Sequence, residues 1–138
     1  MANIRDVAKE ANLSVATVSR YLNQKGYVSQ ASKDQIEQAI RTLNYTPNSV
    51  ARSLSTKQTN YIGLIVPDIM NPFFPELARA VEDVALTYGY TVVLCNSDEN
   101  AEKERHYIES LKQKYIAGFI ITTSCLDARH YESIDLPI

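Results

Sequence analysis

Apolar residues recur at helical spacing in two short segments at the start of the chain. Asn3 is a good N-cap and predicts a helix over residues 4–11, and Ser14 is a good N-cap for a second helix that begins at Val15. The three residues between these helices include Asn12, and asparagine tolerates the left-handed backbone that a sharp turn needs. Two short helices joined by such a turn predict a helix-turn-helix.

The second helix of this motif has a narrow apolar stripe, formed by Val18 and Leu22, that predicts its buried side. The residues on its other faces are small or polar and include one arginine: Val15, Ala16, Ser19, Arg20 and Asn23. Such a face fits the major groove of DNA, where small side chains allow close approach and an arginine can donate two hydrogen bonds to guanine. The alternative is an ordinary surface helix with a solvated arginine.

A third amphipathic helix is predicted over residues 30–43, with Ser29 as its N-cap. Gly26 is expected to break the second helix before it. The third helix closes a small core, so the sequence predicts a compact head of three helices.

The segment after the head has the composition of a hinge and a linker. Pro47 ends the head, and Asn48 can cap a short helical segment over residues 49–55. We expect this segment to be disordered until something organises it, because isolated helices below ~12 residues are marginal in water. The polar residues 56–60 have the character of a linker.

The second half of the chain alternates apolar runs with amphipathic segments. Strands are predicted over residues 61–66, 91–95 and 118–122, and helices over 74–88 and 101–114. This order, with short connections, predicts a parallel α/β sheet. The apolar stripe of the first of these helices is expected to face the sheet and comprises Phe74, Leu77, Ala78, Val81, Val84, Ala85 and Tyr88.

Ligands of parallel sheets bind beyond the carboxyl ends of the strands. The segments that follow the three strands are 67–73, 96–100 and 122–124. They offer aromatic rings, carboxylates, amides and hydroxyls, a mixture suited to a sugar. Structural alternatives remain open, because Phe74 also suits the helix core and Asp98 and Asn100 also suit the cap of the next helix.

Charge divides the chain into two parts. The 138 residues carry a net charge of -2, but residues 1–59 hold 8 Lys or Arg against 4 Asp or Glu, whereas residues 60–138 hold 6 against 12. The first part is therefore +4 and the second -6. A basic head on an acidic body suits a protein whose head alone meets a polyanion such as DNA.

Several classes of protein lack support in the sequence. It shows no signal peptide and no long apolar run, which predicts a cytoplasmic protein without membrane contact. Cys95 and Cys125 lack metal-ligand spacing and are expected to be buried thiols. His106 and His130 lack a ligand partner, and no nucleophile with a nearby base or nucleotide-binding glycine motif is evident. We therefore expect a binding protein with no cofactor and no metal, and not an enzyme.

At this point the sequence resembles the LacI/GalR family of bacterial repressors, and the resemblance spans essentially the whole chain. The residues that carry it are 4–8, Ser14, 16–20, 22–23, 28–29, 43–45, 47–48 and 50–54. Asn12 departs from the turn glycine that is usual in the family.

The resemblance implies roles in DNA binding. Positions 15, 16 and 20 look like base readers, Thr17 and Ser19 look like phosphate or base contacts, and residues 48–55 look like the hinge helix. Family members bind pseudo-palindromic operators as dimers, with paired hinge helices in the minor groove and a leucine, here Leu54, wedged between base pairs. The expected DNA-binding residues are Ser14, Val15, Ala16, Thr17, Ser19, Arg20, Asn23, Asn48, Ala51, Arg52 and Leu54.

The resemblance also implies an effector pocket in the second half of the chain. A sugar or sugar phosphate is the expected ligand, and the expected pocket residues are Phe73, Phe74, Asp68, Asn71, Asp98 and Thr123. The family continues into another strand and a second lobe beyond position 138. Either the chain is a fragment or its fold is completed in another way, and with one lobe alone we do not expect it to bind effector tightly.

The sequence thus predicts a dimeric, sequence-specific transcriptional repressor, concerned with carbohydrate use and controlled by a small sugar-like effector. The predicted parts are a helix-turn-helix domain over residues 1–47, a hinge helix and linker over 48–59, and part of an effector-binding core over 60–138. One alternative is a regulator controlled by a phosphorylated protein partner through the surface helix 76–88. A sugar-binding transport protein is a weaker alternative, since it needs a signal peptide and no basic head.

Overall fold

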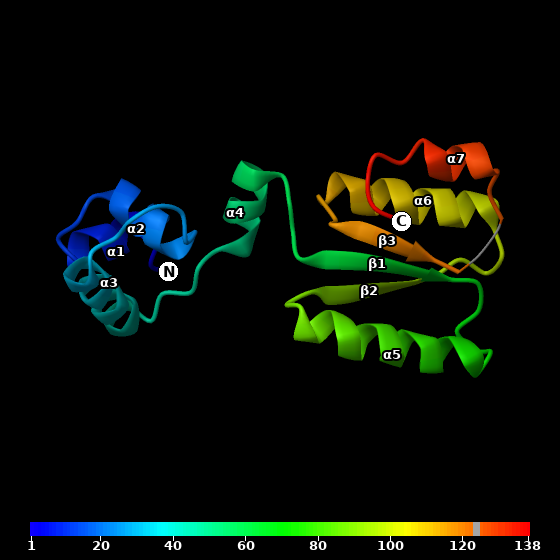
Figure 1. Cartoon of the computed structure of the whole chain (residues 1–138), viewed down its shortest axis with the longest axis horizontal. Coiled ribbons are helices and arrows are strands. Elements are labelled where there is room, and N and C mark those ends of the chain that lie inside the picture. Colours follow the sequence, from blue (N-terminus) through cyan, green and yellow to red (C-terminus); the bar gives the residue numbers. More distant parts are fainter. Residues whose placement is uncertain (123–124) are drawn as a thin grey trace. The chain divides into compact units, whose positions relative to one another are not determined.

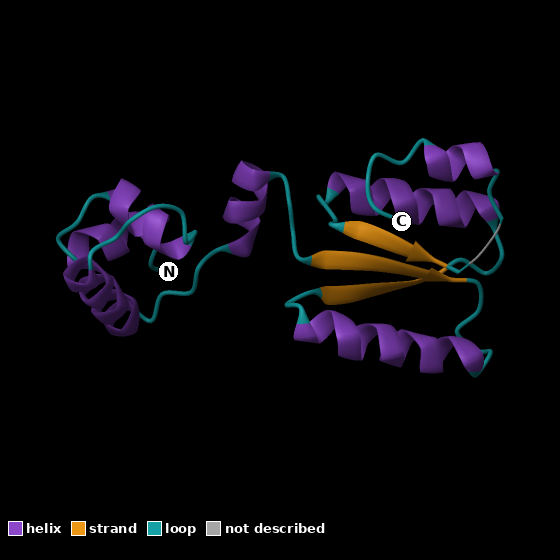
Figure 2. Cartoon of the chain, in the orientation of Figure 1, coloured by secondary structure: helices purple, strands orange, loops and turns teal. Residues whose placement is uncertain are grey.

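The computed structural model describes residues 1–122 and 125–138 and divides the chain into two compact units, Met1–Ser49 and Val50–Ile138. The elements are α1 (Ile4–Glu10), α2 (Val15–Leu22), α3 (Gln30–Leu43), α4 (Ser49–Thr56), β1 (Tyr61–Val66), α5 (Phe73–Thr87), β2 (Thr91–Asn96), α6 (Ala101–Gln113), β3 (Gly118–Ile121) and α7 (Ala128–Glu132). Helices α1 to α3 come first, then the short helix α4, and Figures 1 and 2 show that a parallel sheet with helices on both faces follows. This architecture confirms the predicted fold class.

The core of the first unit is built from the predicted apolar stripes. Val7 on α1, Val18 on α2 and Ile36 on α3 are completely buried, and Ala8 and Ala39 are nearly so. Leu22, Ile40 and Leu43 are partly buried and pack against this cluster. The three helices therefore share one small core, as their spacing predicted.

The turn between α1 and α2 has the left-handed backbone expected of it. Asn12 has φ 54°, its N–H donates to the Lys9 carbonyl at 3.2 Å, and the N–H of Leu13 donates to the Ala8 carbonyl at 2.9 Å. These two bonds satisfy carbonyls that the end of a helix leaves open. The Asn3 side chain caps the other end of α1 in a capping box with Asp6.

The end of α2 differs from the prediction, because Gly26 is not the residue that stops the helix. Gln24 takes the left-handed conformation, with φ 53°, and its N–H donates to the Tyr21 carbonyl at 3.2 Å. The N–H of Lys25 donates to the Arg20 carbonyl at 3.1 Å. This pair of bonds is a Schellman motif, which needs a left-handed residue directly after the helix, and Gly26 lies two residues later.

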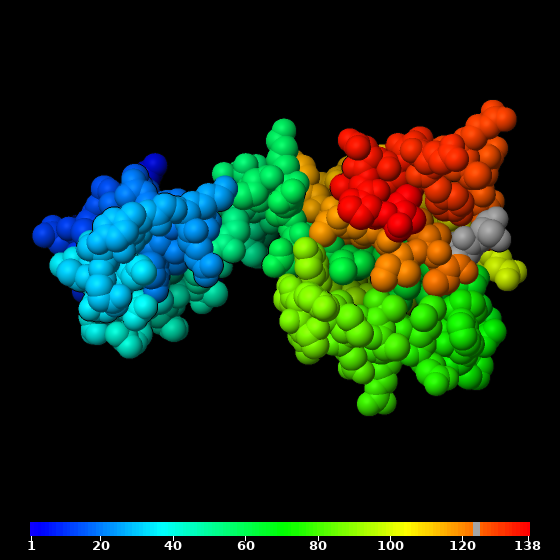
Figure 3. Space-filling view, viewed as in Figure 1, coloured from blue at the N-terminus to red at the C-terminus, as the bar shows by residue number. Residues whose placement is uncertain are grey.

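Helix α4 contradicts the expectation of a disordered hinge segment, since residues 49–56 are helical. Its last turn is closed by the Thr56 hydroxyl, which donates to the Arg52 carbonyl at 3.0 Å, and by the N–H of Lys57, which donates to the Ser53 carbonyl at 2.7 Å. None of its residues is buried, and atoms in the green colour of this stretch are visible at the surface in the space-filling view (Figure 3). The helix therefore contributes no residue to a buried core.

The second unit is a three-stranded parallel sheet in the order β2-β1-β3. Helix α5 covers one face, and α6 and α7 cover the other (Figure 2). The larger core lies on the side of α6 and α7, where Ile65 and Phe119 from the sheet meet Ile108 and Leu111 from α6. None of the helices in the described residues is long and apolar enough to cross a membrane.

Two hydrogen bonds hold the chain just before it enters β1. Thr59 donates two hydrogen bonds to the Tyr115 carbonyl, from its N–H at 3.0 Å and from its hydroxyl at 2.9 Å. Tyr115 follows α6 in the left-handed conformation, with φ 56°. The last residues of the expected linker are therefore tied to the loop that precedes β3.

Helix α5 is less buried than its apolar stripe predicted. Ala85 is its one buried residue, whereas Val84 is 59% exposed and Tyr88 76% exposed. Both line an apolar groove of about 490 Å³ that also includes Ile62 and Ile120 of the sheet. A sheet of three strands is too narrow to cover both flanks of this helix, so one flank stays open.

Cys95 is buried as predicted, whereas Cys125 is only half-buried. No disulfide joins the two thiols in the described part of the chain. Burial raises the pKa of the Cys95 thiol.

A buried carboxylate links α6 to α7. Glu104 is completely buried, and its Oε1 accepts a 2.5 Å hydrogen bond from the Tyr131 hydroxyl. That hydroxyl accepts from the N–H of Leu126 at 3.3 Å, while Oε2 of Glu104 has no partner among the described residues. Burial, and then the hydrogen bond to Glu104, raise the pKa of Tyr131 to about 12.

We predict that Asn12→Val lowers the free energy of unfolding of the first unit by about 1–2 kcal/mol, because a β-branched residue is strained at positive φ. Asn12→Gly is the matched control and should change stability little, since glycine adopts this conformation freely. Urea unfolding followed by circular dichroism measures both. Equal losses in the two variants would contradict a backbone cause.

We predict that Tyr131→Phe costs about 1–3 kcal/mol at pH 7, because it removes the donor to a buried carboxylate. The pKa of Tyr131 is raised in the folded state, so its contribution is fully present below about pH 10 and is lost as the pH rises toward 12. The wild-type stability should therefore fall more steeply over this window than that of Tyr131→Phe. Urea unfolding at pH 8 and pH 11 tests this, with the exposed Tyr88→Phe as control.

Candidate nucleic-acid interface

Helix α2 begins at a well-formed cap. The Ser14 hydroxyl oxygen accepts from the N–H of Thr17 at 3.1 Å and lies 2.8 Å from the Thr17 hydroxyl. The Ser14 and Thr17 hydroxyls therefore lie at the first turn of the helix. Backbone N–H groups at a helix start favour an anion such as a phosphate.

The outward face of α2 is formed as predicted. Val15, Ala16, Arg20 and Asn23 are exposed, while Ser19 is half-buried and accepts a 3.2 Å hydrogen bond from the Asn23 amide. The buried Val18 on the opposite side fixes this orientation. The helix thus presents small side chains and one guanidinium together on one surface.

A contact between α2 and α3 was not predicted from the sequence. The Tyr21 hydroxyl donates to Oε1 of Glu37 at 2.7 Å. This hydrogen bond, followed by burial, raises the pKa of Tyr21. The two residues are 16 positions apart, and no local spacing pattern joins them. The bond fastens α2 to α3 beside Arg20.

The expected hinge residues lie at or just before α4. Leu54 is 65% exposed and Val50 is 66% exposed, one turn apart on the helix. Asn48 precedes the helix, and Ala51 and Arg52 lie on exposed positions within it. Val50 and Leu54 therefore form a small exposed apolar surface on this helix.

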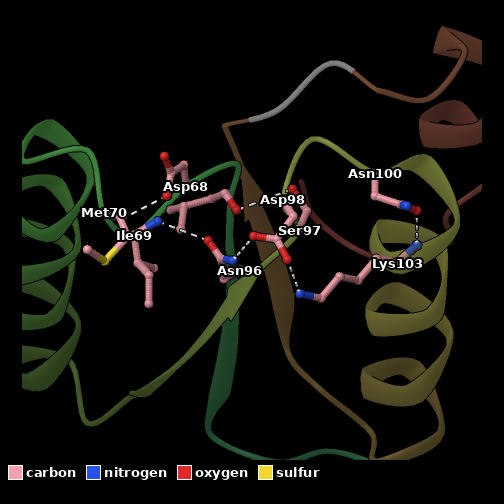
Figure 4. Close-up of polar contacts among 9 residues, drawn as sticks. Asp68, Ile69, Met70, Asn96, Ser97, Asp98, Asn100 and Lys103 are labelled. Atoms are coloured by element: carbon pink, nitrogen blue, oxygen red, sulfur yellow. Dashed lines mark hydrogen bonds and ion pairs between the residues drawn. The ribbon is translucent and has the colours of Figure 1, made fainter.

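A second set of polar side chains lies at the carboxyl ends of the strands (Figure 4). The Asn96 amide oxygen accepts from the N–H of Ile69 at 2.9 Å, and its nitrogen donates to Oδ1 of Asp98 at 2.5 Å. Oδ2 of Asp98 lies 2.5 Å from the Lys103 ammonium. The hydrogen bonds from Lys103 and then from Asn96 lower the pKa of Asp98.

Asp98 and Asn100 differ in their local roles. Asn100 is the N-cap of α6, since its side-chain oxygen accepts from the N–H of Lys103 at 3.0 Å. Asp98 does not cap the helix. Its carboxylate instead accepts hydrogen bonds from the side chains of Lys103 and Asn96. The alternative role as a cap is therefore confirmed for Asn100 and wrong for Asp98. Sequence reasoning missed the part that Lys103 plays here.

The remaining expected pocket residues surround the start of α5. Asp68 accepts from the N–H of Met70 at 2.9 Å, and Asn71 accepts from the N–H of Phe73 at 3.1 Å. Phe73 is 60% exposed, and its ring meets the half-buried Phe74 edge to face, with centroids 5.1 Å apart. Thr123 lies outside the described residues.

Two family models match the chain. Residues 3–48 match the model of bacterial regulatory proteins of the lacI family, and residues 59–138 match that of periplasmic binding proteins and the sugar binding domain of the LacI family. The chain belongs to the LacI family. This family is one of regulatory proteins and not of enzymes.

Relatives of this LacI-family chain include named sugar operon repressors. It is 64% identical over 138 residues to the ribose operon repressor of Halalkalibacterium halodurans, covering 100% of the chain and 42% of that protein. It is 46% identical over 138 residues to the ribose operon repressor of Bacillus subtilis, again covering 100% of the chain and 42% of the relative. The chain thus spans less than half the length of these relatives.

The solved structures include a similar fold. The crystal structure of the Lac repressor dimer bound to operator and the anti-inducer ONPF matches with a TM-score of 0.83 at 28% identity. The match covers 99% of this LacI-family chain and 43% of that chain. The predicted family resemblance is confirmed by these findings.

Proposed function

We propose that this chain is the DNA-binding part of a cytoplasmic repressor of sugar-utilisation genes, whose affinity for DNA is set by a small sugar-like effector. The observation that carries the proposal is the outward face of α2, small and polar with a single arginine, in a part of the chain, residues 1–59, that has a net charge of +4. The names of its relatives, ribose operon repressors among them, support sugar utilisation and make ribose the first effector to test.

The proposed parts of the chain follow from this function. Residues 1–47 would be the DNA-binding domain, 48–59 the hinge and linker, and 60–138 part of the effector-binding core. The family models, which match residues 3–48 and 59–138, support this division. They leave unmatched the stretch between the two, in which α4 lies.

In the proposed complex, α2 enters the major groove. Val15 and Ala16 are small enough for the helix to come close to the base edges, and Arg20 donates two hydrogen bonds to guanine O6 and N7. Ser14, Thr17, Ser19 and Asn23 are proposed to contact phosphates and neighbouring bases. Phosphate contacts of this kind set the register of the helix, while the arginine supplies sequence preference.

Helix α4 is proposed to pair with its twin in a homodimer and enter the minor groove of a pseudo-palindromic operator. The exposed Leu54 would then insert between base pairs and kink the duplex, a distortion that costs a few kcal/mol and is offset by added contact. The similar Lac repressor was solved as a dimer bound to operator, and this supports a dimer here. Asn48, Ala51 and Arg52 are the further proposed contacts of this segment.

The effector is proposed to bind at the carboxyl edge of the sheet, with Phe73, Phe74, Asp68 and Asn71 nearest to it. Asp98 is held by Lys103 and Asn96 and would need to exchange these partners to reach a ligand. Thr123 is retained as a proposed contact by resemblance alone. Binding would act on DNA affinity through the order of α4, which has no core of its own.

Selection of bound sequences from a random DNA pool by the chain tests the proposal. Enrichment of a two-fold symmetric sequence is the expected result, and no enrichment over the starting pool contradicts sequence-specific binding. Repeating the selection with the full-length protein in the presence of ribose tests the effector. An unchanged yield with ribose but a change with a phosphorylated protein partner would favour the alternative regulator.

We predict that Arg20→Ala weakens binding to the selected duplex by about 1–3 kcal/mol and relaxes the preference at one guanine. Fluorescence anisotropy with the selected duplex and a random duplex measures both effects. Arg41→Ala on α3 removes the same charge and is the matched control. Equal loss on both duplexes would show a general electrostatic contact in place of base reading.

We predict that Leu54→Ala reduces the bend of the bound duplex, because the alanine side chain is too short to unstack a base step. Energy transfer between dyes at the duplex ends measures the bend. Leu54→Met keeps the apolar bulk and should retain it. A bend that survives in Leu54→Ala would dismiss the wedge.

A further inference from the structure

The loop that follows α2 lies against the side chain of Arg20. We infer that Gly26 is a positioning residue for DNA recognition: by leaving room for the stem of Arg20, it lets the loop hold this arginine in place before DNA arrives. The inference rests on the proposed base-reading role of Arg20. It concerns residues within the first unit only.

The loop is tied to the backbone of the residue that it positions. The N–H of Lys25 donates to the Arg20 carbonyl at 3.1 Å, and the N–H of Gln24 donates to the Tyr21 carbonyl at 3.2 Å. These bonds turn the chain back over the last turn of α2. Gly26 follows with φ +85°, a conformation that residues with a side chain rarely adopt.

The contact with Arg20 is close and centred on its aliphatic stem. A Cβ atom on Gly26 would lie 3.1 Å from Cδ, 3.4 Å from Cγ and 3.7 Å from Nε of Arg20. The distance to Cδ is shorter than an ordinary carbon–carbon contact, and the distance to Cγ is at the lower limit of one. The stem thus occupies the space that a side chain at position 26 would take. Nη1 of Arg20 also donates to the Tyr27 carbonyl, at a long 3.5 Å.

Holding the arginine in this way favours recognition. A long exposed side chain samples many rotamers, and ordering it on binding costs affinity. A guanidinium has five N–H groups, so one bond to the Tyr27 carbonyl leaves donors for both acceptors of a guanine. The aliphatic stem of Arg20 is restrained, while its guanidinium remains available to donate to a base.

Gly89 offers a control for backbone strain. It also has positive φ, at +76°, but no atom lies within 4 Å of the position of an added Cβ. Gly89→Ala therefore introduces the strain without the contact. Gly26→Asn is a second test variant, because asparagine tolerates positive φ better than alanine but still adds a Cβ next to Arg20.

The first experiment uses the 138-residue chain without DNA. Nuclear magnetic resonance relaxation of the arginine Nε–H groups is compared between Arg20 and the exposed Arg5 and Arg41. Arg20 should be more ordered than both in the wild type and should lose this order in Gly26→Ala and Gly26→Asn. Gly89→Ala should leave it unchanged. Equal mobility of the three arginines in the wild type would overturn the inference.

The second experiment is a double-mutant cycle on DNA. The readout is the ratio of affinities for the selected duplex and for one in which the guanine read by Arg20 is replaced. Gly26→Ala should lower this ratio about two- to tenfold, as expected when one side chain must be ordered on binding. In the Arg20→Ala background the same change should have no effect. Thermal unfolding of each variant confirms that the head is folded, and Gly26→Asn replaces Gly26→Ala if it is not.

The outcomes separate the two proposals. If Arg20→Ala alone leaves the ratio unchanged, base reading by Arg20 fails, and the inference falls with it. If Arg20→Ala lowers the ratio but Gly26→Ala lowers it equally in both backgrounds, base reading stands and the inference is overturned, because Gly26 then acts through the loop alone. If Gly26→Ala lowers the affinity ratio only when Arg20 is present, the inference is supported.

Discussion

The crossing of α1 and α2 is the constraint on which the proposed DNA-binding face depends. Val7 and Val18 are completely buried at this crossing, and the small Ala8 lets the helices approach closely. Left-handed Asn12 supplies the sharp turn between them. Once Val18 points inward, the geometry of a helix turns residues 16 and 20 outward, and Val15, one turn before Val18, stays 43% exposed at the edge of the buried side. The recognition surface is thus a by-product of core packing, and its chemistry can vary without disturbing the fold.

Order in α4 has a different origin from order in the head. The head is stabilised by a shared core, whereas α4 has no buried residue and is closed by hydrogen bonds within its own last turn. Short helices without tertiary packing lie close to the balance between helix and coil. A partner that contacts Val50 and Leu54 therefore has a large influence on this segment for a small binding energy. Such a segment is well suited to link DNA affinity to an effector.

Much of the fold could be predicted from the sequence because its signals are local. Asn3, Ser14 and Ser29 all cap the helices expected of them. Helix ends were harder to predict, since Gln24 and Tyr115 take left-handed conformations that are usual for glycine and asparagine. Propensity alone does not identify these positions, because tertiary packing compensates the local strain.

The candidate sites were predicted only where their residues are related by a local pattern. The outward face of α2 follows from helical periodicity, so its residues lie together as expected. The hydrogen bond between Tyr21 and Glu37, which are 16 positions apart, has no such signal. The ion pair between Asp98 and Lys103, five positions apart, joins a loop to a helix and does not follow from the period of either. The exposure of Val84 also escaped prediction, because an apolar stripe records which side of a helix avoids water and not how much of a sheet is present to cover it.

The anchoring of Thr59 to the Tyr115 carbonyl has a mechanical consequence. It fixes the incoming chain at the edge where the strands begin, whereas Asp68 and Asn96 lie where they end. A strand of six residues at about 3.3 Å each separates the two edges by roughly 20 Å. The strands that span this distance are hydrogen-bonded side by side, so a ligand proposed for the far edge would influence the anchor through the sheet and not by direct contact.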